Sequence, residues 1–199
     1  GRAGHTHSHG RKRRRGALSP SMALRATIFK LDLHVADMVR GYYDSHALTL
    51  ARHPSETDER MMMRVLAFSL LADEHLAFTR GLSTTEEPAL WRKDLTGAIV
   101  TWVELGHPDG RRLLQASGKA EQVVVFCYGG PASQVWWQGA QQGLERIRNL
   151  SVYSVRSEAV RELANLAQRN MTLHVSIEEG MAMVSSDSGS VVVEIETWR

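Results

Sequence analysis

The sequence predicts an α/β protein with a mixed β-sheet that is flanked by helices and ends in a β-meander. Three observations support this fold class. Residues 26–35 alternate apolar and polar side chains, as in a strand with one buried face. Residues 122–128 form a near-continuous apolar run, which is typical of a strand covered on both faces. The chain ends in three short strand patterns that are separated by turn residues.

The first half of the chain predicts two strands followed by a helix. Residues 42–51 are expected to pair antiparallel with the strand at 26–35. A helix is expected to begin at Pro54 and Ser55, because Ser55 and Asp58 resemble a capping box and acids crowd the first turn. A mixed segment at 84–93, with Pro88 near its start, predicts a short helix.

The second half alternates strand and helix patterns. This order implies a parallel portion of the sheet with right-handed crossovers. Two glycine-containing turns, Glu179-Gly180 and 187–189, then separate the strands of the meander. The expected elements are a strand at 98–105, a helix from His107 to Leu114, a strand at 122–128, a helix at 133–148, a strand at 150–155, a helix at 157–168 capped by Ser157, and strands at 172–177, 181–184 and 190–196.

Length and composition predict one soluble, cytoplasmic domain. The chain has 199 residues, of which 43% are hydrophobic and 23% charged, enough for a core. No apolar run approaches the roughly 20 residues that cross a bilayer, so no membrane partner is expected. Cys127 is the only cysteine and sits within an apolar run, which predicts a buried, inert thiol and excludes a disulfide framework.

Residues 1–21 differ from the rest of the chain. They carry six Lys and Arg residues and no acid, whereas residues 22–199 carry 18 bases and 22 acids. We expect a disordered basic leader or an expression-derived arm, with a nucleic-acid-binding tail as the alternative. The arm also holds His5, His7 and His9, which could bind a metal loosely. Residues 22–199 are expected to form a single domain.

Four segments carry a resemblance to a known family. They are MALRATIFKLDL from Met22, HPSETDERMM from His53, KDLTG with the following WVELG from Lys93, and QVVVFCYGG from Gln122. Together they resemble the YaeQ family over essentially all of residues 22–199, which implies a natural start at Met22. YaeQ-like proteins are similar to the PD-(D/E)xK nuclease superfamily, so the resemblance implies a nuclease-like core. In that superfamily a front helix supplies a Glu, one strand an Asp, and a neighbouring strand D/E-x-K.

The resemblance implies a metal-dependent phosphodiesterase or nuclease. Such a site needs carboxylates that converge on Mg²⁺ or Mn²⁺ and a cation near the developing negative charge. Glu104, Asp94 and Glu59 are the candidate catalytic acids and metal ligands. The residue two positions after Glu104 is Gly106 rather than Lys, so Lys119 is the candidate catalytic lysine, supplied from another element.

Each acid also has a structural interpretation. Glu104 could be an exposed edge acid, Asp94 a cap, and Glu59 a complement to the helix dipole. If Thr96-Gly97 forms a hairpin, Asp94 lies near Ala98 and about 20 Å from Glu104.

Two functions therefore stay open. In the first, the chain is a metal-dependent nuclease, which could be degenerate. In the second, it is a non-catalytic module that binds nucleic acid or takes part in transcription. Nucleic acid is the expected partner, and a monomer or weak oligomer is the expected state.

Overall fold

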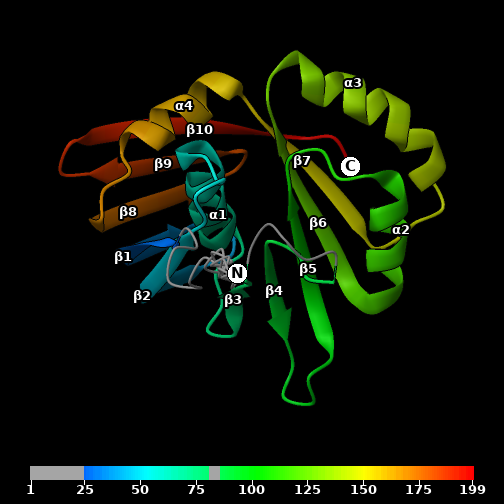
Figure 1. The fold of residues 1–199 in the computed structure, drawn as a ribbon, viewed down its shortest axis with the longest axis horizontal. Helices are drawn as coiled ribbons and strands as arrows, with labels where there is room; N and C mark the ends of the chain where they lie inside the picture. Colours follow the sequence, from blue (N-terminus) through cyan, green and yellow to red (C-terminus); the bar gives the residue numbers. More distant parts are fainter. Residues whose placement is uncertain (1–24, 81–85) are drawn as a thin grey trace, which may run out of the picture.

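The computed structural model describes residues 25–80 and 86–199, and within these ranges the chain is a mixed α/β protein. Ten strands form one sheet in the order β2-β1-β8-β9-β10-β7-β6-β5-β4-β3, and four α-helices flank it (Figure 1). The strands are β1 Thr27–Asp37, β2 Tyr42–Arg52, β3 Leu76–Phe78, β4 Leu90–Lys93, β5 Ile99–Leu105, β6 Ala120–Tyr128, β7 Leu150–Val155, β8 Asn170–Glu178, β9 Met181–Ser186 and β10 Gly189–Thr197. The helices are α1 Asp58–Leu70, α2 Gly110–Lys119, α3 Pro131–Ala140 and α4 Ser157–Asn165, with a 3-10 turn, η2, at Gln141–Leu144.

The strand pairing confirms most of the predicted topology. β1 and β2 are antiparallel, β5, β6 and β7 are parallel neighbours, and β8, β9 and β10 form the antiparallel meander. Two pairings between these strands were not predicted: β10 lies antiparallel to β7, and β1 lies parallel to β8, with His34 opposite His174. The second pairing joins the start of the domain to its end.

The helix predicted at 84–93 is wrong. Within its described part, residues 90–93 form β4, which pairs with β5 on one side and with the short β3 on the other. Residues 84 and 85 lie outside the described residues. A four-residue strand is too short to show a clear hydrophobic pattern in the sequence. It is stabilised by pairing with its neighbours.

Several helix boundaries also differ from the prediction. The helix expected from His107 to Leu114 is α2, which begins at Gly110 and ends at Lys119. The N-cap of α1 is Thr57 rather than Ser55, and the Thr57 side chain accepts a hydrogen bond from the Arg60 amide. Ser157 lies inside α4, whose N-cap is Arg156. The helix predicted at 133–148 is shorter, because α3 ends at Ala140 and η2 follows it.

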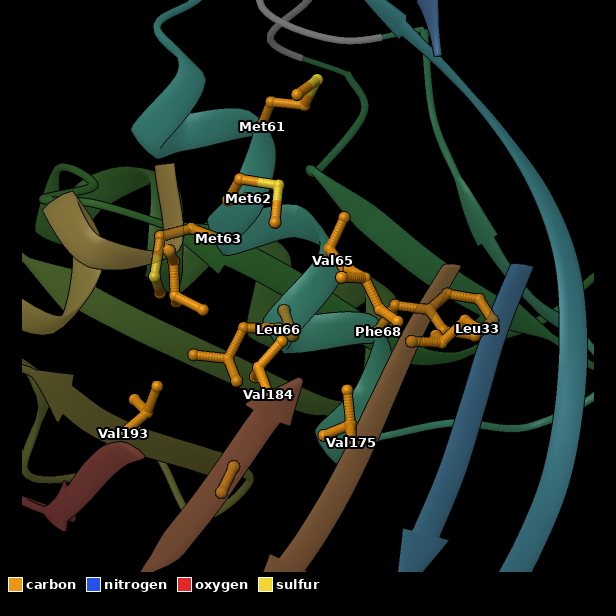
Figure 2. Packing of buried hydrophobic residues seen from close by; sticks show 14 of the residues in the cluster. Leu33, Met61, Met62, Met63, Val65, Leu66, Phe68, Val175, Val184 and Val193 are labelled. Carbon is orange, nitrogen blue, oxygen red and sulfur yellow. The ribbon is translucent and has the colours of Figure 1, made fainter. Parts of the chain in front are cut away.

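The central helix α1 is buried on every side. All nine residues from Met61 to Ser69 are buried, including Arg64. A helix with apolar residues on every side must be enclosed by other elements. In Figure 1, α1 lies between β1, β2, β8 and β9 on one side and β4, β5 and β6 on the other. Figure 2 shows its side chains pointing towards different strands, with Phe68 near Leu33 and Leu66 near Val184.

Two hydrophobic cores share the sheet. The inner core lies between α1, α4 and one sheet face, and the outer core lies between α2, α3 and the opposite face of β5, β6 and β7. Strands β5 to β7 are therefore covered on both faces. Strands β1 and β8 bury only alternate residues, so their second face is open. No helix in the described part of the chain is long and apolar enough to cross a membrane.

Candidate functional site

Glu104 forms an internal ion pair. It lies near the end of β5, and only 7% of its surface is exposed, so it is not an exposed edge acid. Its Oε1 accepts hydrogen bonds from Trp102 Nε1 at 2.8 Å and from Arg112 Nε at 2.7 Å. Arg112 belongs to α2, so this carboxylate ties β5 to the helix that covers it. A buried carboxylate with two donors, one of them cationic, is a stable structural arrangement.

Asp94 organises the tight turn between β4 and β5. Its Oδ1 accepts hydrogen bonds from the Thr96 hydroxyl at 2.6 Å, the Thr96 amide at 2.9 Å and the Ala98 amide at 3.0 Å. The Thr96 hydroxyl, followed by these amides, lowers the pKa of the Asp94 carboxyl. The Asp94 amide also donates to Ala98 O at 2.9 Å, so the chain does form the tight hairpin that was considered for Thr96-Gly97. Glu104 lies six residues after Ala98, a span of about 20 Å in an extended strand.

Glu59 lies on the other side of the sheet from Glu104. It is half-buried in the first turn of α1, the helix that packs in the inner core, whereas Glu104 faces α2 and the outer core. Burial raises the pKa of Tyr128 at the end of β6, while the charge of Arg60 lowers it and the charges of Glu56 and Glu59 raise it. Glu59, Asp94 and Glu104 do not meet at one point.

Lys119 and Glu104 approach the same tryptophan. Lys119 is exposed at the end of α2, and its Nζ lies 5.9 Å from the centre of the Trp102 ring, whose Nε1 donates to Glu104. Trp91 of β4 packs edge-on against Trp102 at 6.4 Å, and Lys93 Nζ lies 3.9 Å from the centre of the Trp91 ring. We call these four residues the tryptophan–lysine cluster: Trp91, Lys93, Trp102 and Lys119. The alternation of β5 already placed Trp102 and Glu104 on one face, but sequence reasoning did not predict Trp91.

The strand next to β5 supplies no acid beside Glu104. Leu90 of β4 pairs with Val103, and the Ala89 amide donates to Val103 O at 2.9 Å. The position adjacent to Glu104 is therefore occupied by Ala89. Across residues 25–80 and 86–199, no group of three or more His, Cys, Asp or Glu side chains is arranged to hold a metal. The residues around Glu104 thus do not fit Mg²⁺ or Mn²⁺, which prefer several oxygen ligands.

A second buried carboxylate, Glu56, is fully engaged by cations. Arg60 and Arg64 each donate to Glu56 at 2.5 Å, and Arg64 also donates to Ala51 O at 3.2 Å. Glu56, Arg60 and Arg64 follow one another at intervals of four residues, which is the spacing of side chains on one face of a helix, so the sequence could have indicated these ion pairs. Glu56 therefore anchors the start of α1.

A partly buried polar contact joins the loop between β5 and α2 to the first turn of α3. His107 Nε2 lies 2.7 Å from Ser133 Oγ, and partial burial lowers the pKa of His107. Cys127 is buried as predicted, and burial raises the pKa of its thiol. A thiol of this kind is protonated at neutral pH and inert.

The fold and the site define a mixed α/β protein whose central carboxylate is held by an arginine. A family model described as "YaeQ protein" matches residues 22–195, and the chain belongs to this family. The proteins named "Uncharacterized protein YaeQ" from Escherichia coli (strain K12) and Salmonella typhi are each 43% identical over 178 residues. These 178 residues are 89% of this chain and 98% of each relative.

Two solved structures share the fold. The crystal structure of YaeQ protein from Xanthomonas axonopodis pv. citri matches with a TM-score of 0.85 and 45% identity, covering 87% of this chain and 98% of that one. That of YaeQ protein from Pseudomonas syringae matches with a TM-score of 0.83 and 36% identity, covering 87% and 96%.

Proposed function

We propose that this protein is a non-catalytic module with a nuclease-like core that binds single-stranded nucleic acid. The observation that carries the proposal is the ion pair of Glu104 with Arg112, at 2.7 Å. This ion pair gives Glu104, the best candidate catalytic acid, a structural role. The position beside Glu104 on β4's side is occupied by Ala89, which has no carboxylate. The order α1, β3-β4-β5, α2, β6 supports a nuclease-like core, because it offers a front helix and two neighbouring strands in the expected sequence.

The tryptophan–lysine cluster is the proposed binding surface. Trp91 is partly exposed and packs on the buried Trp102, so Trp91 is the ring of this pair that can stack on a base; the exposed Lys93 and Lys119 lie beside the two rings. Bases stack on aromatic side chains while cations contact the phosphates, and neither interaction requires a particular base sequence. Since residues 22–199 carry more acids than bases, binding depends on this local cluster and weakens steeply with salt.

Fluorescence anisotropy of labelled single-stranded DNA and RNA at about 50 mM salt tests the proposal. The basic arm would itself bind nucleic acid, so the full chain is used with Arg11, Lys12 and Arg13–Arg15 replaced by Ser. Trp91→Ala is expected to weaken binding at least about fivefold through lost stacking. Lys93→Ala and Lys119→Ala should each reduce the salt dependence. The matched control is Lys30→Ala, because Lys30 is an exposed lysine on another strand, where it bonds Thr49.

A cleavage assay on the same substrates with Mn²⁺ and Mg²⁺ separates this proposal from an active nuclease. We expect no cleavage with either ion. Cleavage that is lost in Glu104→Ala would overturn the proposal in favour of a metal-dependent phosphodiesterase. Equal binding by the wild-type cluster and by Trp91→Ala would overturn the assigned surface.

A further inference from the structure

The open face of the sheet has an ordered arrangement of side chains. The register aligns residues of β2, β1, β8, β9 and β10 in rows that cross all five strands. One row is mainly apolar, and the next carries only histidines and serines. The apolar row is Tyr43, Ala36, Ser176, Met183 and Val192, and the polar row is Ser45, His34, His174, Ser185 and Ser190.

Two imidazoles stack at the centre of the polar row. His34 and His174 are directly opposite in the parallel ladder, with ring centres 4.6 Å apart and planes 17° apart. They line an open depression of about 560 Å³, together with Tyr43, Met183 and Ser185. The pair is accessible, because His174 is exposed and His34 is half-buried.

A hydrogen bond orients one of the two rings. His34 Nδ1 lies 2.7 Å from Ser45 Oγ. In the tautomer in which Nδ1 donates to this hydroxyl, Nε2 keeps its lone pair for another partner. Histidines that bind metals commonly have their second nitrogen held in this way.

We propose that His34 and His174 form a binding site for one borderline divalent transition ion such as Zn²⁺ or Ni²⁺. Imidazole nitrogen is a preferred ligand for these ions, whereas Mg²⁺ prefers oxygen. Zn–N distances of about 2.0–2.1 Å place two ligating nitrogens about 3.3 Å apart in a tetrahedral site. The ring centres of His34 and His174 are 4.6 Å apart and their planes are nearly parallel. Because an imidazole binds a metal ion in the plane of its ring, both side chains must rotate to turn one nitrogen each towards a single ion, and this open face leaves room for that rotation. Two protein ligands leave the remaining positions for water or an added ligand.

This site is independent of the proposed nucleic-acid surface. The His34–His174 pair lies on β1 and β8, whereas the tryptophan–lysine cluster lies on β4, β5 and α2. It also differs from the predicted Mg²⁺ or Mn²⁺ site both in its ligands and in its place in the sheet. Failure of one proposal therefore leaves the other standing.

Calorimetric titration with Zn²⁺ alone tests the site, with Ni²⁺ and Mg²⁺ as further probes. The full chain is used with His5, His7 and His9 replaced by Ala, because the arm would otherwise bind the ion. We expect one Zn²⁺ or Ni²⁺ per chain and no Mg²⁺ binding. His34→Ala and His174→Ala should each abolish saturable binding, and Ser45→Ala should weaken it about tenfold by freeing the His34 ring.

His53→Ala is the matched control. His53 Nδ1 also lies 2.7 Å from a serine hydroxyl, that of Ser55, but within the described residues His53 stacks on no second imidazole. Its replacement should leave Zn²⁺ affinity unchanged. NMR of the histidine rings gives a second readout, in which Zn²⁺ shifts the His34 and His174 signals together. No saturable binding, or binding that survives both His34→Ala and His174→Ala, would overturn the proposal.

Discussion

The strands of the sheet fall into two groups that differ in how many of their faces are covered. Strand β6 lies between both cores, and five consecutive residues from Val123 to Cys127 are buried. Strand β1 borders only the inner core and alternates buried and accessible residues. A strand with two buried faces has nearly every side chain committed to packing, whereas a strand with one buried face has side chains free to bind. The open face of β1 and β8 therefore keeps side chains accessible to solvent, and the proposed His34–His174 site uses two of them.

The largest expected effect comes from the buried charges that anchor α1. Glu56→Ala leaves Arg64 buried without its carboxylate, and we expect a loss of about 3–5 kcal/mol in the free energy of unfolding. Urea denaturation measures it. Asp58→Ala is the control on the same helix, because its ion pair with Arg52 is partly exposed and contributes about 1 kcal/mol or less. Equal losses for the two variants would contradict the buried arrangement.

Substitutions of two neighbouring residues of β1 compare how much its buried face and its open face contribute to stability. Leu33 is fully buried in the inner core, and Leu33→Ala should lower the free energy of unfolding by about 2–5 kcal/mol. His34 points to the open face, and His34→Ala should change it by less than about 0.5 kcal/mol. Thermal unfolding of both variants gives the comparison. A large loss in His34→Ala would mean that the open face contributes to packing.

Removing the Glu104 ion pair measures how much the contact between β5 and α2 contributes to the free energy of unfolding. Glu104→Ala leaves Arg112 Nε and Trp102 Nε1 without this acceptor, and we expect a loss of about 1–3 kcal/mol in urea denaturation. Glu104→Gln keeps one acceptor oxygen and should lose less. A Glu104→Ala variant as stable as the wild type would show that the ion pair is not structural.

The smallest expected effect is the pH dependence of the β4–β5 turn. The pKa of Asp94 is lowered in the folded state, so its contribution is present above its unfolded pKa, about 4, and is lost as pH falls through the lower folded value. The stability difference between wild type and Asp94→Ala should therefore shrink in acid. Unfolding curves at neutral pH and near pH 3 measure it. A difference that does not change with pH would assign the turn's stability to other contacts.

The sequence predicted those features that repeat along the chain. The alternation of β1 and the apolar run of β6 were sufficient to predict both strands and the number of their buried faces, because each pattern follows directly from burial. Two kinds of feature were not predictable. β4 is a short strand that forms only against β5, and the partner of Glu104 is Arg112, which becomes its neighbour only after α2 has packed on the sheet.

Long-range pairing limits site prediction in the same way. His34 and His174 are unremarkable in sequence, and only the β1–β8 register places them side by side. The candidate acids Glu59, Asp94 and Glu104 were selected by residue type and by position at the ends of elements. The structure then places them at separate locations, and their roles in catalysis stay predictions.

The enclosure of α1 has a consequence for synthesis on the ribosome. The helix ends at Leu70, but its partners Val175, Val184 and Val193 come more than 100 residues later. A nascent chain therefore carries a segment with three consecutive methionines whose packing partners are incomplete until the last strands have emerged. Such non-local contacts form late and slowly. During that interval the segment is an apolar surface of the kind that chaperones hold.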